Sequence, residues 1–258
     1  MSHRTGRTSG RVTPGFPAND PDAPNNSSRS ERSLLLAKQA SAVYVQAMKS
    51  AFFAFLVLFF SLAAVAAEPK IESIGAFAGT APDAVKSAIA ETGYRVTGGD
   101  GKVLAEIWPT KAPAAEKKES SAALYPDFVV GAFYGVISFP NGTTDLRGQN
   151  IPAGTYALRY ALLPGDGNHM GVSPNPDFFL LVPVDTDPGP SVKMAYPALI
   201  RASAKASGTA HPAAFGLSSP DARGVAVNQD QGHTIAFFPI KTSASTTSIG
   251  MILSGAAE

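Results

Sequence analysis

The chain of 258 residues contains no cysteine. Disulfide scaffolds, zinc ribbons built on thiolates, thiol nucleophiles and lipid anchors on cysteine are therefore excluded. The stability of the fold must come from burial of apolar side chains, which make up 45% of the sequence. About 190 residues follow the leader described below, and this is enough for one domain with its own core.

Charged residues are also scarce, at 16% of the chain, where about a quarter is usual. This fraction is low for a coiled coil or for a basic nucleic-acid binder. The charges are unevenly distributed, because residues 1–67 carry a net charge of +4 and the residues from Glu68 onward carry −3. The part that we expect to fold has no basic bias, which argues against nucleic-acid binding.

An apolar run without a charged residue covers residues 51–67, between Lys49 and Glu68. A basic residue, an apolar core and an end made of small residues are the three parts of a secretory signal. The sequence therefore predicts a signal peptide at 48–67, cleaved after Ala67 or Ala66. We expect export to the periplasm or to the extracellular space.

The same run is at the short limit for a spanning helix, so a retained membrane anchor through residues 51–67 stays open. Residues 1–47 are rich in Arg, Ser, Pro and Asn. We expect them to be a disordered leader or a mis-assigned gene start, because Met48 and the residues after it resemble a natural start. The positive charge of the leader favours its retention on the cytoplasmic side. Contact with a membrane is expected only through this leader, if it is not cleaved.

Strand patterns dominate the chain after the leader. Residues 93–98 and 102–108 flank a Gly-Asp-Gly sequence, which is typical of a hairpin because Gly accepts a positive φ. Residues 152–163 alternate large apolar side chains with smaller or polar ones, the period of a half-buried strand. Further strands are predicted at 128–139 and 178–184, and a terminal hairpin at 232–240 and 247–253.

Two short helices are predicted, at 194–206 and at 82–91. The first is rich in Ala, Leu, Arg and Lys, with Pro197 near its first turn and Gly208 after its end. With about seven strands and no alternation of strands with long helices, residues 68–258 are predicted to form a single mainly β domain. The specific prediction is an antiparallel β-sandwich of jelly-roll or immunoglobulin-like type with one or two short helices.

Three stretches of this domain carry a resemblance: GYRVTGGDGKVLAEIW (93–108), RGQNIPAGTYALRYALLPGDGNHMGVSPNPDFFLLVP (147–183) and KASGTAHPAAF (205–215). Together they resemble a group of uncharacterised exported bacterial β-sandwich proteins. The resemblance covers most of the chain after the leader and none of the leader itself. It implies export and a β-rich fold, and it implies no chemistry, since the group has no assigned activity.

The loop at 164–177 is the main candidate for a ligand site. It places several polar side chains in close succession between two strong strands: Asp166, Asn168, His169, Asn175 and Asp177. Loops of this length are usually functional or ordered by their own side chains. Turn formation accounts for the same residue types, so this structural interpretation stays open beside the functional one.

Trp108 is the aromatic candidate for contact with a ligand such as a sugar. It precedes Pro109 at the end of a predicted strand, and we therefore expect it to be partly exposed. The remaining large aromatic side chains are expected to fill the core. The candidate ligand-binding residues are thus Asp166, Asn168, His169, Asp177 and Trp108.

No cofactor is predicted, and two metal ions are kept as alternatives. Calcium is suggested by Asp166, Asn168, Gly171 and Asp177, which fall at positions 1, 3, 6 and 12 of an EF-hand-like spacing. Position 5 is Met170, which offers no oxygen ligand, and the flanks resemble strands where an EF-hand has helices.

Zinc is suggested by three histidines, His169, His211 and His233, which a fold could bring together. No two of them have helical spacing, and H-E-x-x-H is absent. The sequence after the leader also lacks G-x-S-x-G and Ser-x-x-Lys.

The sequence thus favours an exported, non-catalytic module that binds a ligand or partner of the cell envelope through the 164–177 loop. The alternative is a metal-assisted hydrolase that uses His169, His211 and His233. A structural envelope component without a small ligand is a third possibility.

Overall fold

A computed structural model describes residues 26–60, 67–113, 123–163, 175–221, 224–230, 232–241 and 246–254. The chain divides into two units, Met1–Ala64 and Val65–Glu258. In its described part the first unit is a single helix, α1 (Asn26–Phe60). Among the described residues, no helix combines the length and the hydropathy that crossing a membrane requires.

Residues 26–47, for which the sequence suggested a disordered leader or a mis-assigned gene start, belong to α1 and are helical. The segment contains neither Gly nor Pro and has many strong helix formers, such as Leu, Ala, Lys and Gln. The Arg- and Ser-rich composition of the whole leader hid this local preference.

The second unit is built on a ten-stranded antiparallel sheet. Its strands follow the order β1 (Lys70–Ile74), β2 (Gly93–Thr97), β3 (Val103–Pro109), β4 (Phe133–Phe139), β7 (Gly154–Leu162), β8 (Asp177–Pro183), β9 (Ala214–Ser218), β12 (Thr246–Ser254), β11 (His233–Lys241) and β10 (Ala226–Asp230). A small second sheet pairs β5 (Thr143–Thr144) with β6 (Asn150–Ile151). The two helices of this unit are α2 (Asp83–Ala88) and α3 (Tyr196–Ser207).

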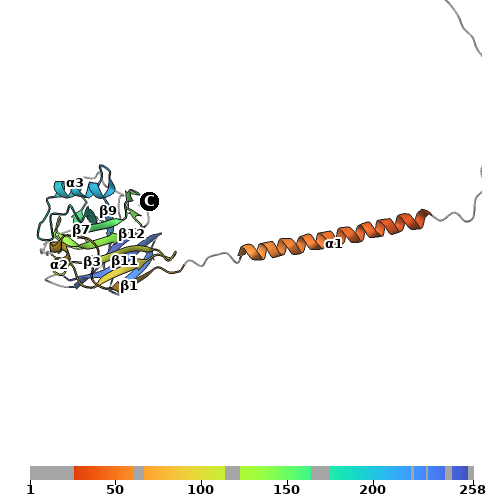
Figure 1. Ribbon diagram of the computed structural model, residues 1–258, viewed down its shortest axis with the longest axis horizontal. Coiled ribbons are helices and arrows are strands. Elements are labelled where there is room, and N and C mark those ends of the chain that lie inside the picture. The colour runs from red at the N-terminus through yellow and green to blue at the C-terminus, as the bar shows by residue number, and fades with distance from the viewer. Residues whose placement is uncertain are drawn as a thin grey trace, which may run out of the picture. The chain divides into compact units, whose positions relative to one another are not determined.

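The large sheet curls until its two edge strands, β1 and β10, approach each other. The strands therefore wrap around a common interior, and the sheet is nearly barrel-like (Figure 1). The mainly β, antiparallel class with few helices is confirmed, whereas a two-layer sandwich is not. Alternation with a period of two indicates only that a strand has an inner and an outer face. The strands of a sandwich and those of a barrel-like sheet both have two such faces.

Most of the predicted elements are present. The first hairpin is the β2–β3 pair, with Tyr94 opposite Ile107, and the terminal hairpin is the β11–β12 pair. Strand β4 begins five residues later than predicted, because the chain turns at Gly131 (φ 81°). A Cβ at Gly131 would collide with the carbonyl oxygen of Met194, whose N–H donates to the Gly131 carbonyl at 3.1 Å.

Apolar side chains are buried on both faces of the sheet. The interior holds large aromatic groups from strands that are distant in sequence, among them Tyr134, Tyr160, Phe179, Phe215 and Phe238. A second cluster lies on the outer face and includes side chains of α2, β4, β7, β8 and α3, and α3 packs mainly against β8. Helix α3 covers one outer side of the curled sheet beside β7 and β9 (Figure 1). Because both faces of β7 and β8 are covered, these two strands are almost continuously buried.

Candidate functional site

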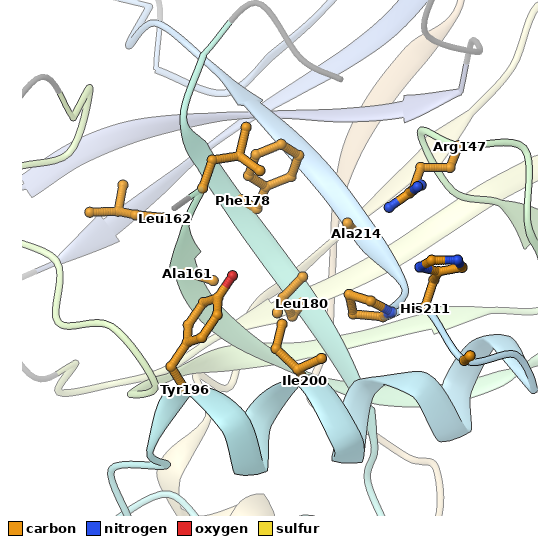
Figure 2. A pocket seen from close by; sticks show the side chains of 12 residues that line it. Arg147, Ala161, Leu162, Phe178, Leu180, Tyr196, Ile200, His211 and Ala214 are labelled. Atoms are coloured by element: carbon orange, nitrogen blue, oxygen red, sulfur yellow. The ribbon is translucent and has the colours of Figure 1, made fainter. Parts of the chain in front are cut away.

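A cavity of about 270 Å³ lies between α3 and the outer face of β7, β8 and β9 (Figure 2). Most of its lining is apolar, including Leu162, Leu163, Phe178, Leu180 and Ile200. Three polar side chains also reach it: Arg147, Tyr196 and His211. We call this space the α3 cavity.

The walls of the α3 cavity follow from the two periodicities of the secondary structure. In β8, Phe178 and Leu180 point to the outer face, whereas Phe179 between them belongs to the interior cluster. In α3, Tyr196 and Ile200 are four residues apart and therefore lie on one helix face. The cavity is the space where these two apolar surfaces do not fully meet.

Arg147 reaches the cavity from the turn between β5 and β6. The carboxylate of Asp145, which is 1% exposed, shapes this turn by accepting hydrogen bonds from the N–H groups of Arg147 at 3.0 Å and Gln149 at 2.9 Å. Its other oxygen accepts from Gln149 Nε2 at 2.7 Å and from the N–H of Ala214 at 3.2 Å. One buried carboxylate therefore fixes the backbone under Arg147 to the start of β9.

His211 reaches the cavity from the turn that follows α3. The hydroxyl of Thr209 donates to Gln149 Oε1 at 2.5 Å, and Gln149 Nε2 donates to the carbonyl of Pro212 at 3.0 Å. Ser207 Oγ also donates to the His211 carbonyl at 2.7 Å. The turns that carry Arg147 and His211 are thus cross-linked through one glutamine side chain.

The polar groups are not evenly distributed around the cavity. Arg147 and His211 lie at one end, while Leu162 and Tyr196 lie at the other (Figure 2). Among the described residues, no Asp or Glu lines the cavity, and Arg147 has no ion-pair partner. Within the part of the chain that the structure describes, no acidic side chain compensates the positive charge at this end of the cavity.

Of the predicted ligand-binding residues, Asp177 lies in the interior with an exposed fraction of 0%. Its carboxylate accepts hydrogen bonds from the N–H groups of Leu124 at 2.9 Å and Tyr125 at 3.2 Å and from the Tyr160 hydroxyl at 2.5 Å. This is the bonding of a residue that ties segments of the fold together. Burial, and then the hydrogen bond to Asp177, raise the pKa of Tyr160 above its ordinary value.

The expected exposure of Trp108 is wrong, because its exposed fraction is 4%. Its indole Nε1 donates to the carbonyl of Gly75 at 2.9 Å, and its ring meets Phe77 edge to face at 5.0 Å between centroids. Trp108 does lie near the end of β3, as the sequence predicted. The segment between β1 and α2 covers its side chain. Arg95 lines a hollow of about 260 Å³ next to Trp108. The carboxylate of Glu106 lies 2.8 Å from the guanidinium of Arg95 and compensates its positive charge.

The other predicted residues are only partly covered by the structure. Asp166, Asn168 and His169 lie outside the described residues, as do Met170 and Gly171. The calcium hypothesis and the three-histidine zinc hypothesis are therefore untested. Within the described ranges, no group of three or more His, Asp or Glu side chains is placed to hold a metal ion.

The two histidines that are described lie on different elements. His211 belongs to the α3 cavity, whereas His233 begins β11. The Nδ1 atom of His233 is buried and has no hydrogen-bond partner among the described residues.

Sequence reasoning missed Arg147, Tyr196 and Ile200 as members of a site. A signal was available for two of them, since Tyr196 and Ile200 have the spacing of one helix face within a correctly predicted helix. No sequence pattern marked Arg147. Its place at the cavity depends on hydrogen bonds that its neighbours Asp145 and Gln149 make to residues 62 to 67 positions after Arg147 in the chain.

Comparison with known proteins adds no family to these observations. No protein-family model, no curated protein and no solved structure matches the chain.

Proposed function

We propose that this chain is an exported, non-catalytic ligand-binding protein and that the α3 cavity is its binding site. The single observation that supports this most is an apolar space of about 270 Å³ with polar side chains gathered at one end. Small-molecule sites are commonly concave and mostly apolar, with a few polar groups that orient the ligand.

The residues that flank the 164–177 loop line the proposed site. Leu163, which precedes the loop, and Phe178, which follows it, both line the α3 cavity. The strands that the loop connects are therefore walls of the proposed site. The predicted loop residues Asp166, Asn168 and His169 stay candidates for a contribution from the loop.

Binding without catalysis is supported by the side chains that line the cavity. Among the described residues, the lining offers one Arg, one Tyr and one His, and none of the lining residues is Ser, Thr, Asp or Glu. A nucleophile needs an adjacent base, and a general base needs a partner that orients it. The lining residues that the structure describes contain neither arrangement.

The competing proposal of a metal-assisted hydrolase is separated by metal analysis of the purified protein. Our proposal predicts no stoichiometric zinc. Stoichiometric zinc that disappears in the His169→Ala variant would favour the hydrolase and contradict our proposal.

Export rests on the sequence pattern of the signal peptide at 48–67. N-terminal sequencing of the protein recovered from the native cell tests it, with a new N-terminus at Ala67 or Glu68 as the expected result. A retained leader would favour the membrane-anchored alternative.

Ligand binding is tested by titrating the purified full chain with 4-(dimethylamino)benzonitrile, a neutral, polarity-sensitive dye small enough for a space of about 270 Å³, and recording its fluorescence. The variant Ile200→Trp fills the cavity with an apolar ring and is expected to weaken dye binding at least tenfold. The matched control is Arg201→Gln, at the neighbouring exposed position of α3, which should leave binding unchanged. Equal binding by Ile200→Trp and by the unchanged chain, with both proteins folded, would contradict the proposal.

A further inference from the structure

We infer that the occupant of the α3 cavity is a small amphipathic carboxylate, whose carboxylate group pairs with Arg147 and His211 while its apolar body lies against β8 and α3. This inference rests on the proposed function and names the chemical class of the ligand.

The charge at the polar end selects an anion. Arg147 and His211 both line this end, and no acidic side chain from the described ranges lines the cavity. Asp145 lies in the same turn as Arg147, but its two oxygens already accept four hydrogen bonds from Arg147, Gln149 and Ala214. The planar guanidinium group of an arginine matches a carboxylate by two parallel N–H···O bonds.

The backbone under both side chains is held before any ligand arrives. Gln149 donates to Asp145 and to the carbonyl of Pro212, and it accepts from the hydroxyl of Thr209. The turns that carry Arg147 and His211 therefore cannot separate without breaking these hydrogen bonds. Ordering such turns in advance lowers the entropic cost of binding.

The remaining lining selects an apolar body and limits its length. Leu180 and Ile200 face the middle of the cavity, and Leu162 and Tyr196 lie opposite the charged end (Figure 2). A cavity of roughly 150 Å³ accommodates a benzene-sized ligand. A space of about 270 Å³ then suits an apolar body of about eight to ten carbon atoms.

The test compares three probes with the same eight-carbon chain: octanoate, 1-octanol and octylamine. Binding to the purified full chain is measured by isothermal titration calorimetry at low salt. We expect octanoate to bind most tightly and octylamine most weakly, because only the carboxylate gains from the positive end.

Variants separate the contribution of the charge from that of the apolar walls. Arg147→Gln should weaken octanoate binding about twofold to fivefold, the effect of an exposed ion pair, and should leave 1-octanol binding unchanged. Arg147→Lys should retain part of the affinity, since it keeps the charge but loses the planar fork. Arg201→Gln removes an exposed cation that does not line the cavity, so it should change nothing.

The possible failures are distinguishable. If 1-octanol binds as tightly as octanoate and Arg147→Gln has no effect, the carboxylate inference is wrong while the proposed function survives. If none of the three probes binds and 4-(dimethylamino)benzonitrile does not bind either, the proposed function itself is wrong.

Discussion

Arg159 and Asp187 form an ion pair in which both side chains have exposed fractions of 0%. The guanidinium of Arg159 donates to both carboxylate oxygens, at 2.9 and 2.6 Å. It also donates to the carbonyls of Gly131, Gly189 and Val192. One buried side chain of β7 therefore holds the segment that leads from β8 to α3, and with it the start of the helix that covers the cavity.

Removing this arginine should destabilise the fold strongly. Arg159→Met leaves Asp187 buried without its partner, and we expect a loss of about 3–5 kcal/mol in the free energy of unfolding. Urea denaturation followed by fluorescence measures it. The double variant Arg159→Met with Asp187→Leu should recover part of the loss, because no uncompensated charge stays buried. A loss below about 1 kcal/mol in the single variant would contradict this account of the pair.

Three buried tyrosines should lower the free energy of unfolding at alkaline pH. Burial raises the pKa of Tyr125, Tyr134 and Tyr160 above the ordinary value, and Asp177 raises that of Tyr160 further. A tyrosine whose pKa is raised in the folded state stabilises that state fully at any pH below the pKa of the unfolded chain. This contribution is lost as the pH rises from the unfolded pKa through the folded pKa. The free energy of unfolding should therefore fall above about pH 10.

Urea denaturation between about pH 8 and pH 11 checks this dependence, since the reference pKa of tyrosine is about 10. The variant Tyr134→Phe removes one of the three groups and should make the decline shallower. A free energy of unfolding that stays constant across this range would show that the tyrosines ionise as freely in the folded protein as in the unfolded chain.

At the scale of secondary-structure elements, local sequence signals were sufficient to predict α3. Pro197 lies in the first turn, and Gly208 ends the helix in the left-handed region at φ 67°. Both positions were predicted from the residue types alone, because proline fits the start of a helix and glycine its end. Helix α3 is thus a prediction that the structure confirms.

The end of α3 gives a prediction for stability. Gly208→Ala places a Cβ in the left-handed region, where it costs about 1 kcal/mol. The matched control is Gly75→Ala, since no atom lies within 4 Å of a Cβ at either position and only Gly208 has a positive φ. Thermal unfolding should show a lower midpoint for Gly208→Ala alone, and equal midpoints for the two variants would contradict the assignment.

Strands β1, β9 and β10 were not predicted, and each has a physical reason. Strands β1 and β10 are the two edges of the sheet and carry many polar residues, so their place depends on pairing with β2 and β11. Strand β9 is short and contains Gly216, and its hydrogen bonds join β8 to β12. Tertiary pairing overrides weak local propensity in all three.

The candidate site was less predictable than the elements that form it. The apolar walls could be anticipated from the alternation in β8 and from the spacing of Tyr196 and Ile200. The charged end could not, because Arg147 and His211 come together through the hydrogen bonds of Asp145 and Gln149. Such long-range contacts leave no period in the sequence.

At the scale of the whole molecule, the order of the strands decides the architecture. One continuous sheet runs from β1 to β10, and its edges approach each other. The sequence predicted alternating strands correctly but could not determine how far the sheet curls, since a sandwich and a barrel-like sheet have similar strand patterns. The curl leaves an outer face on β7 and β8 for α3 to cover, and the cavity lies in that contact.

The most direct test of the account is a titration of the folded protein with octanoate, followed by NMR of the side-chain methyl groups. We predict that the methyl signals of Leu162, Leu180 and Ile200, which line the α3 cavity, shift in a saturable manner. Those of Val96 and Ile137, in the interior of the sheet, should stay in place. Saturable shifts confined to the interior, or no saturable shift at the cavity, would contradict the claim that the space under α3 binds an amphipathic carboxylate.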